Sequence, residues 1–203
     1  MTRIIAGISL VAIVALIGAT WWVTRPEEDV FADCRSSTVG TGTASIGGPF
    51  TLVSGDGETV TEEDVIDGLT LVYFGYTFCP DVCPFDMARN AEATDLLEAR
   101  GITVKPVMIT VDPARDTPEV IGGYAGAMHE RAVGLTGSEA QVEAAKKAYR
   151  VYGQRASDDE NYLVDHTTLT YLMAPGEGML AFFRRDASPE EMADRVACYA
   201  ERL

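Results

Sequence analysis

Two cysteines four positions apart stand where a strand-like segment meets a helix-like one, and this junction constrains the fold more than any other feature. The pentad is Cys79-Pro80-Asp81-Val82-Cys83. An apolar run from Leu71 to Phe78 precedes it, and Pro84, a residue tolerated in a first helical turn, follows it. Two thiols in such a loop can close a disulfide or hold one soft metal ion. The spacing alone leaves both alternatives open, together with a purely structural pair.

The first 25 residues carry the pattern of a membrane anchor. Ile4 to Val23 is a 20-residue run in which Ser9 and Thr20 are the polar side chains, long enough for a hydrocarbon core of about 30 Å. Arg3 precedes the run and acidic residues follow it, so we expect one transmembrane helix with the rest of the chain outside the cytoplasm. The alternative is a cleaved signal peptide, although this run is longer than a usual signal-peptide core.

The composition after the anchor predicts a linker over residues 26–48 and one domain over residues 49–203. The linker is rich in glycine and serine. From residue 26 onward the chain has 14 basic and 31 acidic residues, a net charge of −17. This charge excludes a nucleic-acid partner, which would select basic patches. It keeps an exported domain soluble, or it favours a basic partner surface.

Apolar patterns and turn residues predict alternating strands and helices. The expected strands are 50–53, 58–60, 69–76, 102–111, 133–135, 164–174 and 179–184. The expected helices begin after the caps Thr61, Thr117, Ser138 and Ser188 and, for a fifth over 84–100, at Pro84. Parallel strands with crossover helices, closed by an antiparallel hairpin, describe an α/β thioredoxin-like sandwich with an N-terminal β-hairpin extension.

A histidine would convert the dithiol into a copper site, and the chain has two. His166 opens a strand-like segment, and two thiolates with one neutral imidazole form a soft ligand set that suits copper. Zinc could use the same ligands but normally takes a fourth. Asp165 is a candidate hydrogen-bond partner of the imidazole. We expect His129, in a polar helix end, to be a solvated surface residue. Three methionines are expected in the core: Met87, Met108 and Met173.

Three motifs in this order resemble those of the Sco/SenC family of copper proteins. They are FGYTFCPDVCP at 74–84, VDPARDTP at 111–118 and DHT at 165–167, and the similarity covers about residues 46–200. The resemblance implies a fold similar to thioredoxin. It also implies one copper ion per chain, as Cu(I) or Cu(II), with Cys79, Cys83 and His166 as its ligands.

The same resemblance implies a membrane-tethered copper chaperone. Such a protein helps to build the dinuclear copper centre of cytochrome c oxidase subunit II, which would be its partner, and other copper chaperones would be further partners. We then expect a single-pass protein of the bacterial inner membrane with its C-terminal domain in the periplasm. One alternative is a thiol–disulfide oxidoreductase with Cys79 and Cys83 as catalytic residues, which keeps the partner's cysteines reduced. Another is a copper or redox sensor. His166 separates the first two, because reductase chemistry does not require an imidazole.

The second motif contributes Asp112, Arg115 and Asp116. These residues follow the end of a predicted strand, where α/β proteins gather their sites. They would order the copper loop or contact the partner. The alternative is a capped turn stabilised by an Arg–Asp pair.

Two cysteines, Cys34 and Cys198, lie outside the motifs. In an oxidising compartment such a leftover pair predicts a disulfide. It would tie the start of the exported domain to an amphipathic last helix that has Met192, Val196 and Tyr199 on its inner face.

Overall fold

The computed structural model describes residues 15–22, 30–35 and 46–203. The chain divides into two units, Met1–Asp33 and Cys34–Leu203. In the first unit residues 15–22 are helical. Within the described ranges no helix is long and apolar enough to cross a membrane. More than half of the predicted span and most of the predicted linker lie outside these ranges, so the anchor remains a sequence prediction.

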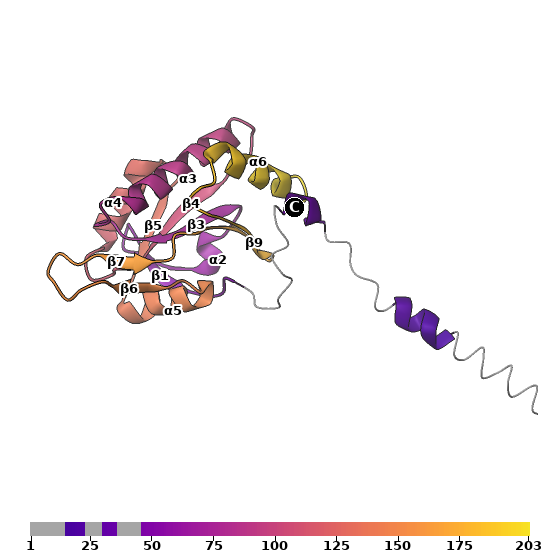
Figure 1. The fold of residues 1–203 in the computed structure, drawn as a ribbon, viewed down its shortest axis with the longest axis horizontal. Coiled ribbons are helices and arrows are strands. Elements are labelled where there is room, and N and C mark those ends of the chain that lie inside the picture. Colours follow the sequence, from indigo (N-terminus) through magenta and orange to yellow (C-terminus); the bar gives the residue numbers. More distant parts are fainter. Residues whose placement is uncertain (1–14, 23–29, 36–45) are drawn as a thin grey trace, which may run out of the picture. The chain divides into compact units, whose positions relative to one another are not determined.

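The second unit is a mixed α/β fold (Figure 1). A short 3₁₀ helix, η1 (Ala32–Cys34), leads into it. The elements that follow are β1 (Thr51–Ser54), β2 (Thr59–Thr61), α2 (Glu62–Val65), β3 (Thr70–Gly75), α3 (Val82–Glu98), β4 (Lys105–Thr110), α4 (Pro118–Met128), β5 (Val133–Thr136), α5 (Glu139–Tyr149), β6 (Gly153–Arg155), β7 (Val164–His166), β8 (Thr170–Ala174), β9 (Gly178–Phe183) and α6 (Pro189–Ala200).

Seven strands form one sheet in the order β2-β1-β5-β4-β3-β8-β9. Strands β3, β4 and β5 are parallel, while β1 with β2 and β8 with β9 form the antiparallel hairpins at the two edges. Helices α3, α4 and α6 lie on one face of this sheet and α5 on the other (Figure 1). Because both faces are covered, every residue of β3 is buried, as its continuously apolar sequence predicts. The expected thioredoxin-like architecture is confirmed.

Helix starts follow the predicted capping residues. The hydroxyls of Thr117, Ser138 and Ser188 each accept an N–H from the first turn of α4, α5 and α6. Thr61 and Asp64 form a capping box on α2. The end of α3 is set by Gly101, whose φ of +78° is a left-handed conformation that glycine adopts without strain.

The predicted strand over residues 164–174 is wrong as a single element. Residues 164–166 form β7, which pairs with β6 in a separate two-stranded sheet, and residues 170–174 form β8 in the main sheet. Strand β6 was not predicted. The helix before it ends at Tyr149 rather than near residue 152, because Arg150 adopts a left-handed conformation (φ 55°, ψ 36°) that turns the chain towards β6. The separate strand β7 carries His166.

The sulfurs of Cys34 and Cys198 are bonded, with their Cα atoms 5.6 Å apart. The bond joins η1 to α6, whose Met192, Val196 and Tyr199 are fully buried. In Figure 1 the C-terminus lies at the opposite end of this unit from β6 and β7.

Candidate metal centre

The loop between β3 and α3 places Cys79 at the start of the helix. Within the described part of the chain the Asp81 side chain makes no capping hydrogen bond, and the Cys79 sulfur takes that role by accepting the Cys83 N–H at 3.3 Å. The first backbone N–H groups of a helix lack partners within it and carry partial positive charge. A thiolate at Cys79 is therefore stabilised by the helix that begins beside it.

The pKa values of the two thiols are shifted in opposite directions. Burial alone would raise the pKa of Cys79, but hydrogen bonds from the backbone of Cys83, Asp81 and Val82 outweigh it, and the pKa is lowered. Cys83 is fully buried, and this burial raises its pKa to about 12. The half-buried Cys79 is therefore the thiolate-prone sulfur of a free pair.

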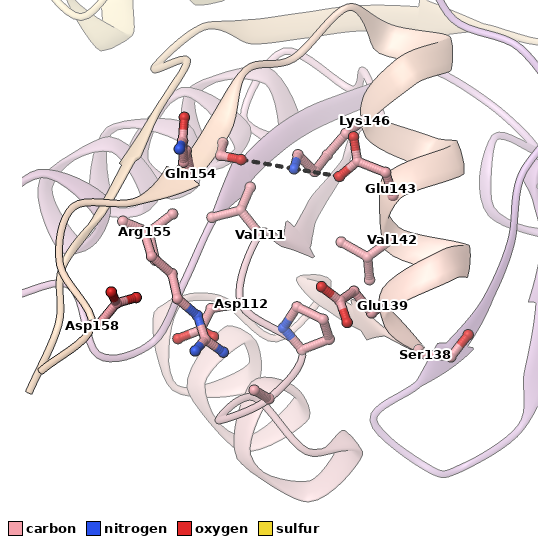
Figure 2. A pocket seen from close by; sticks show the side chains of 15 residues that line it. Val111, Asp112, Ser138, Glu139, Val142, Glu143, Lys146, Gln154, Arg155 and Asp158 are labelled. Atoms are coloured by element: carbon pink, nitrogen blue, oxygen red, sulfur yellow. Dashed lines mark hydrogen bonds and ion pairs between the residues drawn. The ribbon is translucent and has the colours of Figure 1, made fainter. Parts of the chain in front are cut away.

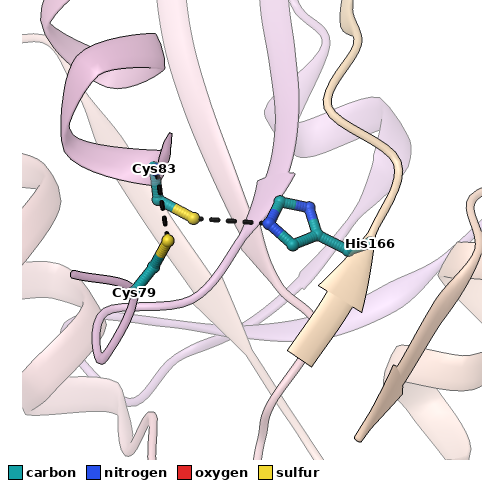
Figure 3. Close-up of side chains that lie close together, drawn as sticks. All are labelled: Cys79, Cys83 and His166. Atoms are coloured by element: carbon teal, nitrogen blue, oxygen red, sulfur yellow. Dashed lines mark hydrogen bonds between the residues drawn. The ribbon is translucent and has the colours of Figure 1, made fainter. Parts of the chain in front are cut away.

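His166 at the end of β7 faces the buried thiol (Figure 3). Its Nε2 lies 3.5 Å from the Cys83 Sγ, and its Nδ1 lies 3.0 Å from the Thr167 carbonyl oxygen. A carbonyl can only accept, so Nδ1 carries the proton and Nε2 presents a lone pair towards the sulfur. Burial lowers the pKa of His166, which favours this neutral form. An imidazole fixed in this way is prepared to be a metal ligand.

Aromatic rings from β3 and the following loop position the imidazole. The rings of Tyr73 and Tyr76 meet His166 edge-on, with centroids 6.1 and 5.8 Å away. The Tyr76 hydroxyl also accepts the Val164 N–H at 3.2 Å, which ties β7 to the loop. A Cβ at Gly75 would lie 2.6 Å from the Tyr73 ring and 3.1 Å from the Cys83 sulfur. Glycine at this position therefore makes room for the Cys83 sulfur.

Together, Cys79, Cys83 and His166 offer three ligand atoms within 4.8 Å of one another. Two sulfurs and one imidazole nitrogen at this separation can converge on one soft metal ion after small side-chain movements. The two sulfurs can instead bond to each other. The structure thus brings together the three residues that the motifs predicted.

A buried carboxylate anchors the loop that carries Cys79. Asp116 is fully buried, and it accepts the Thr77 N–H at 3.2 Å and the Thr77 hydroxyl at 2.6 Å. It also accepts the Thr110 hydroxyl at 2.6 Å. Burial raises the pKa of Asp116, and these hydrogen bonds oppose the rise by favouring the carboxylate. The residue therefore fixes the loop to the end of β4.

Beside this anchor, Arg115 and Tyr162 form a stack over the loop. The Arg115 guanidinium lies 3.7 Å from the ring centroid of Tyr162 and 4.6 Å from that of Phe78, and its Nε pairs with Asp112. The Tyr162 hydroxyl donates to Asp112 at 2.7 Å. The Arg–Asp pair expected of a capped turn is thus present, and Arg115 also contacts the metal loop through Phe78.

The expected partner of the imidazole was Asp165, but this residue is exposed and the Thr167 carbonyl takes that position. Sequence reasoning also missed Tyr73, Tyr76 and Thr77. Tyr76 and Thr77 lie inside the first motif, so their proximity to the cysteines was the available signal. The three methionines expected in the core are Met87, Met108 and Met173, and all are buried.

A pocket of about 580 Å³ is lined in part by Asp112, which also contacts Arg115 and Tyr162 (Figure 2). Its walls come from the segment after β4, from α5 and from β6, and they include Asp112 and Arg155. Lys146 crosses one side, where its amine donates to the Gly153 carbonyl at 2.9 Å and pairs with Glu143 at 2.6 Å. This lysine holds β6 against α5 and so supports the strand that pairs with β7.

A second group of possible ligands, Asp95, Glu98 and His129, is engaged in hydrogen bonds and an ion pair. The prediction of a solvated His129 is wrong, because its side chain is 7% exposed. Its Nδ1 accepts the Arg131 N–H at 3.0 Å, so its Nε2 carries the proton and donates to Asp95 at 3.2 Å. Glu98 pairs with the Arg131 guanidinium. The imidazole lone pair is thus already used.

Comparisons with known proteins agree with the motifs. The model of the SCO1/SenC family matches residues 38–201. Protein SenC of Rhodobacter capsulatus is 50% identical over 203 residues, which is all of this chain and 91% of that protein. A crystal structure of Arabidopsis thaliana ScoI with copper bound is 37% identical, with a TM-score of 0.75 over 78% of this chain and 100% of that one. Bradyrhizobium japonicum ScoI with copper bound is 35% identical, with a TM-score of 0.69 over the same shares.

Proposed function

The chain belongs to the SCO1/SenC family, and from this premise we propose that it is a copper chaperone. It binds one copper ion through Cys79, Cys83 and His166. It delivers this ion to subunit II of cytochrome c oxidase, where the dinuclear copper centre is built.

The observation that carries the proposal is the protonation and the orientation of the three donor side chains. Cys79 is prone to ionise, and the neutral His166 directs a lone pair at the Cys83 sulfur. Thiolates select Cu(I), and an imidazole tolerates both copper states, so this set can hold copper in either oxidation state. The half-buried Cys79 gives a partner's ligands access to the ion.

Two relatives with copper bound support the choice of metal, and they match this chain over the whole of their own length. The role in oxidase assembly is supported by family membership. The proposed location is the bacterial inner membrane, with residues 4–23 as the anchor and the domain in the periplasm. Its support is the 20-residue apolar run and the charges that flank it.

The unequal thiols favour a second candidate, a thiol–disulfide oxidoreductase. The Cys79 thiolate would attack a partner's disulfide, forming a mixed disulfide and releasing one partner thiol. Cys83, as a thiolate, would then attack the Cys79 sulfur, which releases the second partner thiol. The partner's disulfide gains the two electrons that the Cys79–Cys83 dithiol loses. Burial raises the pKa of Cys83, so this second step draws on a small thiolate fraction at neutral pH.

One transfer assay distinguishes the candidates. The copper-loaded full-length chain is mixed with the metal-free, reduced copper domain of subunit II from the same organism. A chaperone transfers its copper, and the acceptor gains the absorption of a copper–thiolate centre. A reductase gives no such gain, yet its metal-free reduced form converts a disulfide-bonded acceptor to the dithiol. An acceptor that gains no copper from the loaded chain contradicts the proposal.

A further inference from the structure

Exposed apolar side chains lie on the chain segments that carry the three donors. Among the described residues from 46 to 203, the exposed large apolar side chains are Phe78, Phe85, Val120, Tyr152, Leu163 and Leu203. Three of the six lie within three residues of a ligand in the sequence. Phe78 precedes Cys79, Phe85 follows Cys83 by two positions, and Leu163 precedes His166 by three.

Tyr152 belongs to the same group through hydrogen bonds. Its N–H donates to the Thr167 hydroxyl at 3.1 Å, and its carbonyl accepts the Thr167 N–H at 3.0 Å. It is therefore held beside the residue that fixes the tautomer of His166. We call Phe78, Phe85, Tyr152 and Leu163 the collar.

Water contact with large apolar side chains is unfavourable, and isolated ones are common on protein surfaces. Here the exposures are high, at 53% for Phe78, 69% for Phe85 and 57% for Tyr152. Their concentration on the segments that carry a ligand set is typical of an interaction surface. The ring of Phe78 also contacts the Arg115 guanidinium, which is itself stacked on Tyr162.

The charge on the collar segments indicates the chemistry of the partner. Residues 76–85 and 152–167 carry five exposed acidic side chains and one exposed basic one. They are Asp81, Asp158, Asp159, Glu160 and Asp165 against Arg155. The basic side chain is stacked on Tyr162, with 4.2 Å from its guanidinium carbon to the ring centroid. The five acidic side chains, which we call the rim, are therefore in excess on these segments. A complementary surface has an apolar centre and a basic edge.

We propose that the collar is the docking surface for the copper acceptor, and that the acceptor's contact face is apolar with basic residues at its edge. The proposal rests on the chaperone function proposed above and names the surface that performs its protein contact. The collar buries its aromatic rings against the partner, and the acidic rim attracts the basic edge. Docking there brings the acceptor's own ligands to the half-buried Cys79. A second copy of this chain is disfavoured as occupant, because two rims of the same sign would meet.

The test compares surface variants in the transfer assay with the reduced, metal-free copper domain of subunit II as probe. The collar variant is Phe85→Ser with Leu163→Ser, which leaves the ligands and the Arg115 stack in place. The matched control is Leu203→Ser, an equally exposed apolar residue at the chain end. Copper content is measured first in each. We expect equal copper loading, with the Kd for the acceptor raised at least about tenfold in the collar variant alone.

A third variant, Asp158→Asn with Asp159→Asn and Glu160→Gln, tests the rim. It should slow association at low salt, and the rate of the wild-type chain should fall towards that of this variant as salt is raised. If the wild-type chain transfers copper and the collar variant binds and transfers equally well, the docking proposal is wrong while the function stands. If the wild-type chain transfers none, the function itself is wrong. Self-association that the collar substitutions abolish, without effect on the acceptor, overturns the proposal in favour of a homodimer surface.

Discussion

The four cysteines form two pairs that differ in bonding state, in sequence separation and in position in the fold. Cys79 and Cys83 are free, four residues apart, and sit at the start of α3, where the helix favours the thiolate form of Cys79. Cys34 and Cys198 are bonded across a separation of 164 residues, in η1 and α6. The first pair lies beside His166 of β7, and the second includes Cys198 of α6, the last helix. Strands β6 and β7 lie at the opposite end of the unit from the C-terminus (Figure 1).

The comparison shows that surroundings decide what a cysteine pair does. The long-range pair joins two elements far apart in the sequence, so its bond constrains the unfolded chain. The short-range pair closes almost no loop, so a bond between its sulfurs adds little to stability and can be given up for a metal ion.

The largest effect is expected on stability when the long-range bond is removed. For so long a loop the chain-entropy model gives roughly 4–5 kcal/mol, as an upper figure. The double variant Cys34→Ser with Cys198→Ser should therefore unfold at a much lower denaturant concentration than the wild-type chain, with unchanged copper content. Serine at Cys79 and Cys83 is the matched pair, and it should change stability little. Equal denaturant midpoints for the wild type and both double variants would show that the long-range disulfide does not stabilise the fold.

A smaller effect is expected at the anchor of the metal loop. Asp116→Asn replaces a carboxylate oxygen with an amide that cannot accept from the threonine donors, so one buried hydroxyl loses its partner. We expect a loss of about 2 kcal/mol in stability and a drop in Cu(II) affinity on the order of tenfold, because Thr77 is released. The control is Asp165→Asn, the same change at an exposed carboxylate beside His166. Chelator competition that gives both variants the wild-type affinity would show that Asp116 does not position the ligands.

The smallest effect concerns pH. Burial lowers the pKa of His166 below its unfolded value of 6.5, so the folded state binds fewer protons than the unfolded state in that range. This contribution to stability is fully present above pH 6.5 and is lost as the pH falls through the folded pKa. In the metal-free reduced chain, His166→Gln should therefore lose less stability than the wild-type chain between pH 7.5 and pH 5, by on the order of 1 kcal/mol or less. Parallel stability curves for the two proteins would place the imidazole in solvent.

Much of the fold was predictable because local signals agreed with the global arrangement. The continuously apolar β3 was predicted as a central strand, and the polar caps Thr117, Ser138 and Ser188 marked helix starts. The two-stranded sheet was not predictable in this way. Strand β6 reads Gly-Gln-Arg and has no apolar alternation. It exists because the Lys146 amine, seven residues upstream, donates to the Gly153 carbonyl and because β7 pairs with it, and neither contact leaves a signal in the apolar pattern.

The site residues likewise separate into those that the sequence predicts and those that depend on distant contacts. The residue types and the motifs predicted Cys79, Cys83 and His166, since soft donors at motif positions can be read from the chain. The partner of His166 could not be read, and Asp165 was the wrong choice because side chains alternate along a strand and this one points to solvent. The contacts of Tyr73 and Tyr76 with the imidazole depend on how β7 crosses the loop, which only the three-dimensional arrangement specifies.

The copper content of the purified full-length chain tests the central claim most directly. Each protein is treated with a mild dithiol reductant, loaded with copper, washed with a chelator and desalted before metal analysis. We predict one copper ion per chain for the wild type and for Cys198→Ser, and none for Cys83→Ser or for wild type oxidised at Cys79 and Cys83. A copper ion retained by Cys83→Ser, or none in the reduced wild type, would contradict the assignment of the metal to the short-range pair and His166.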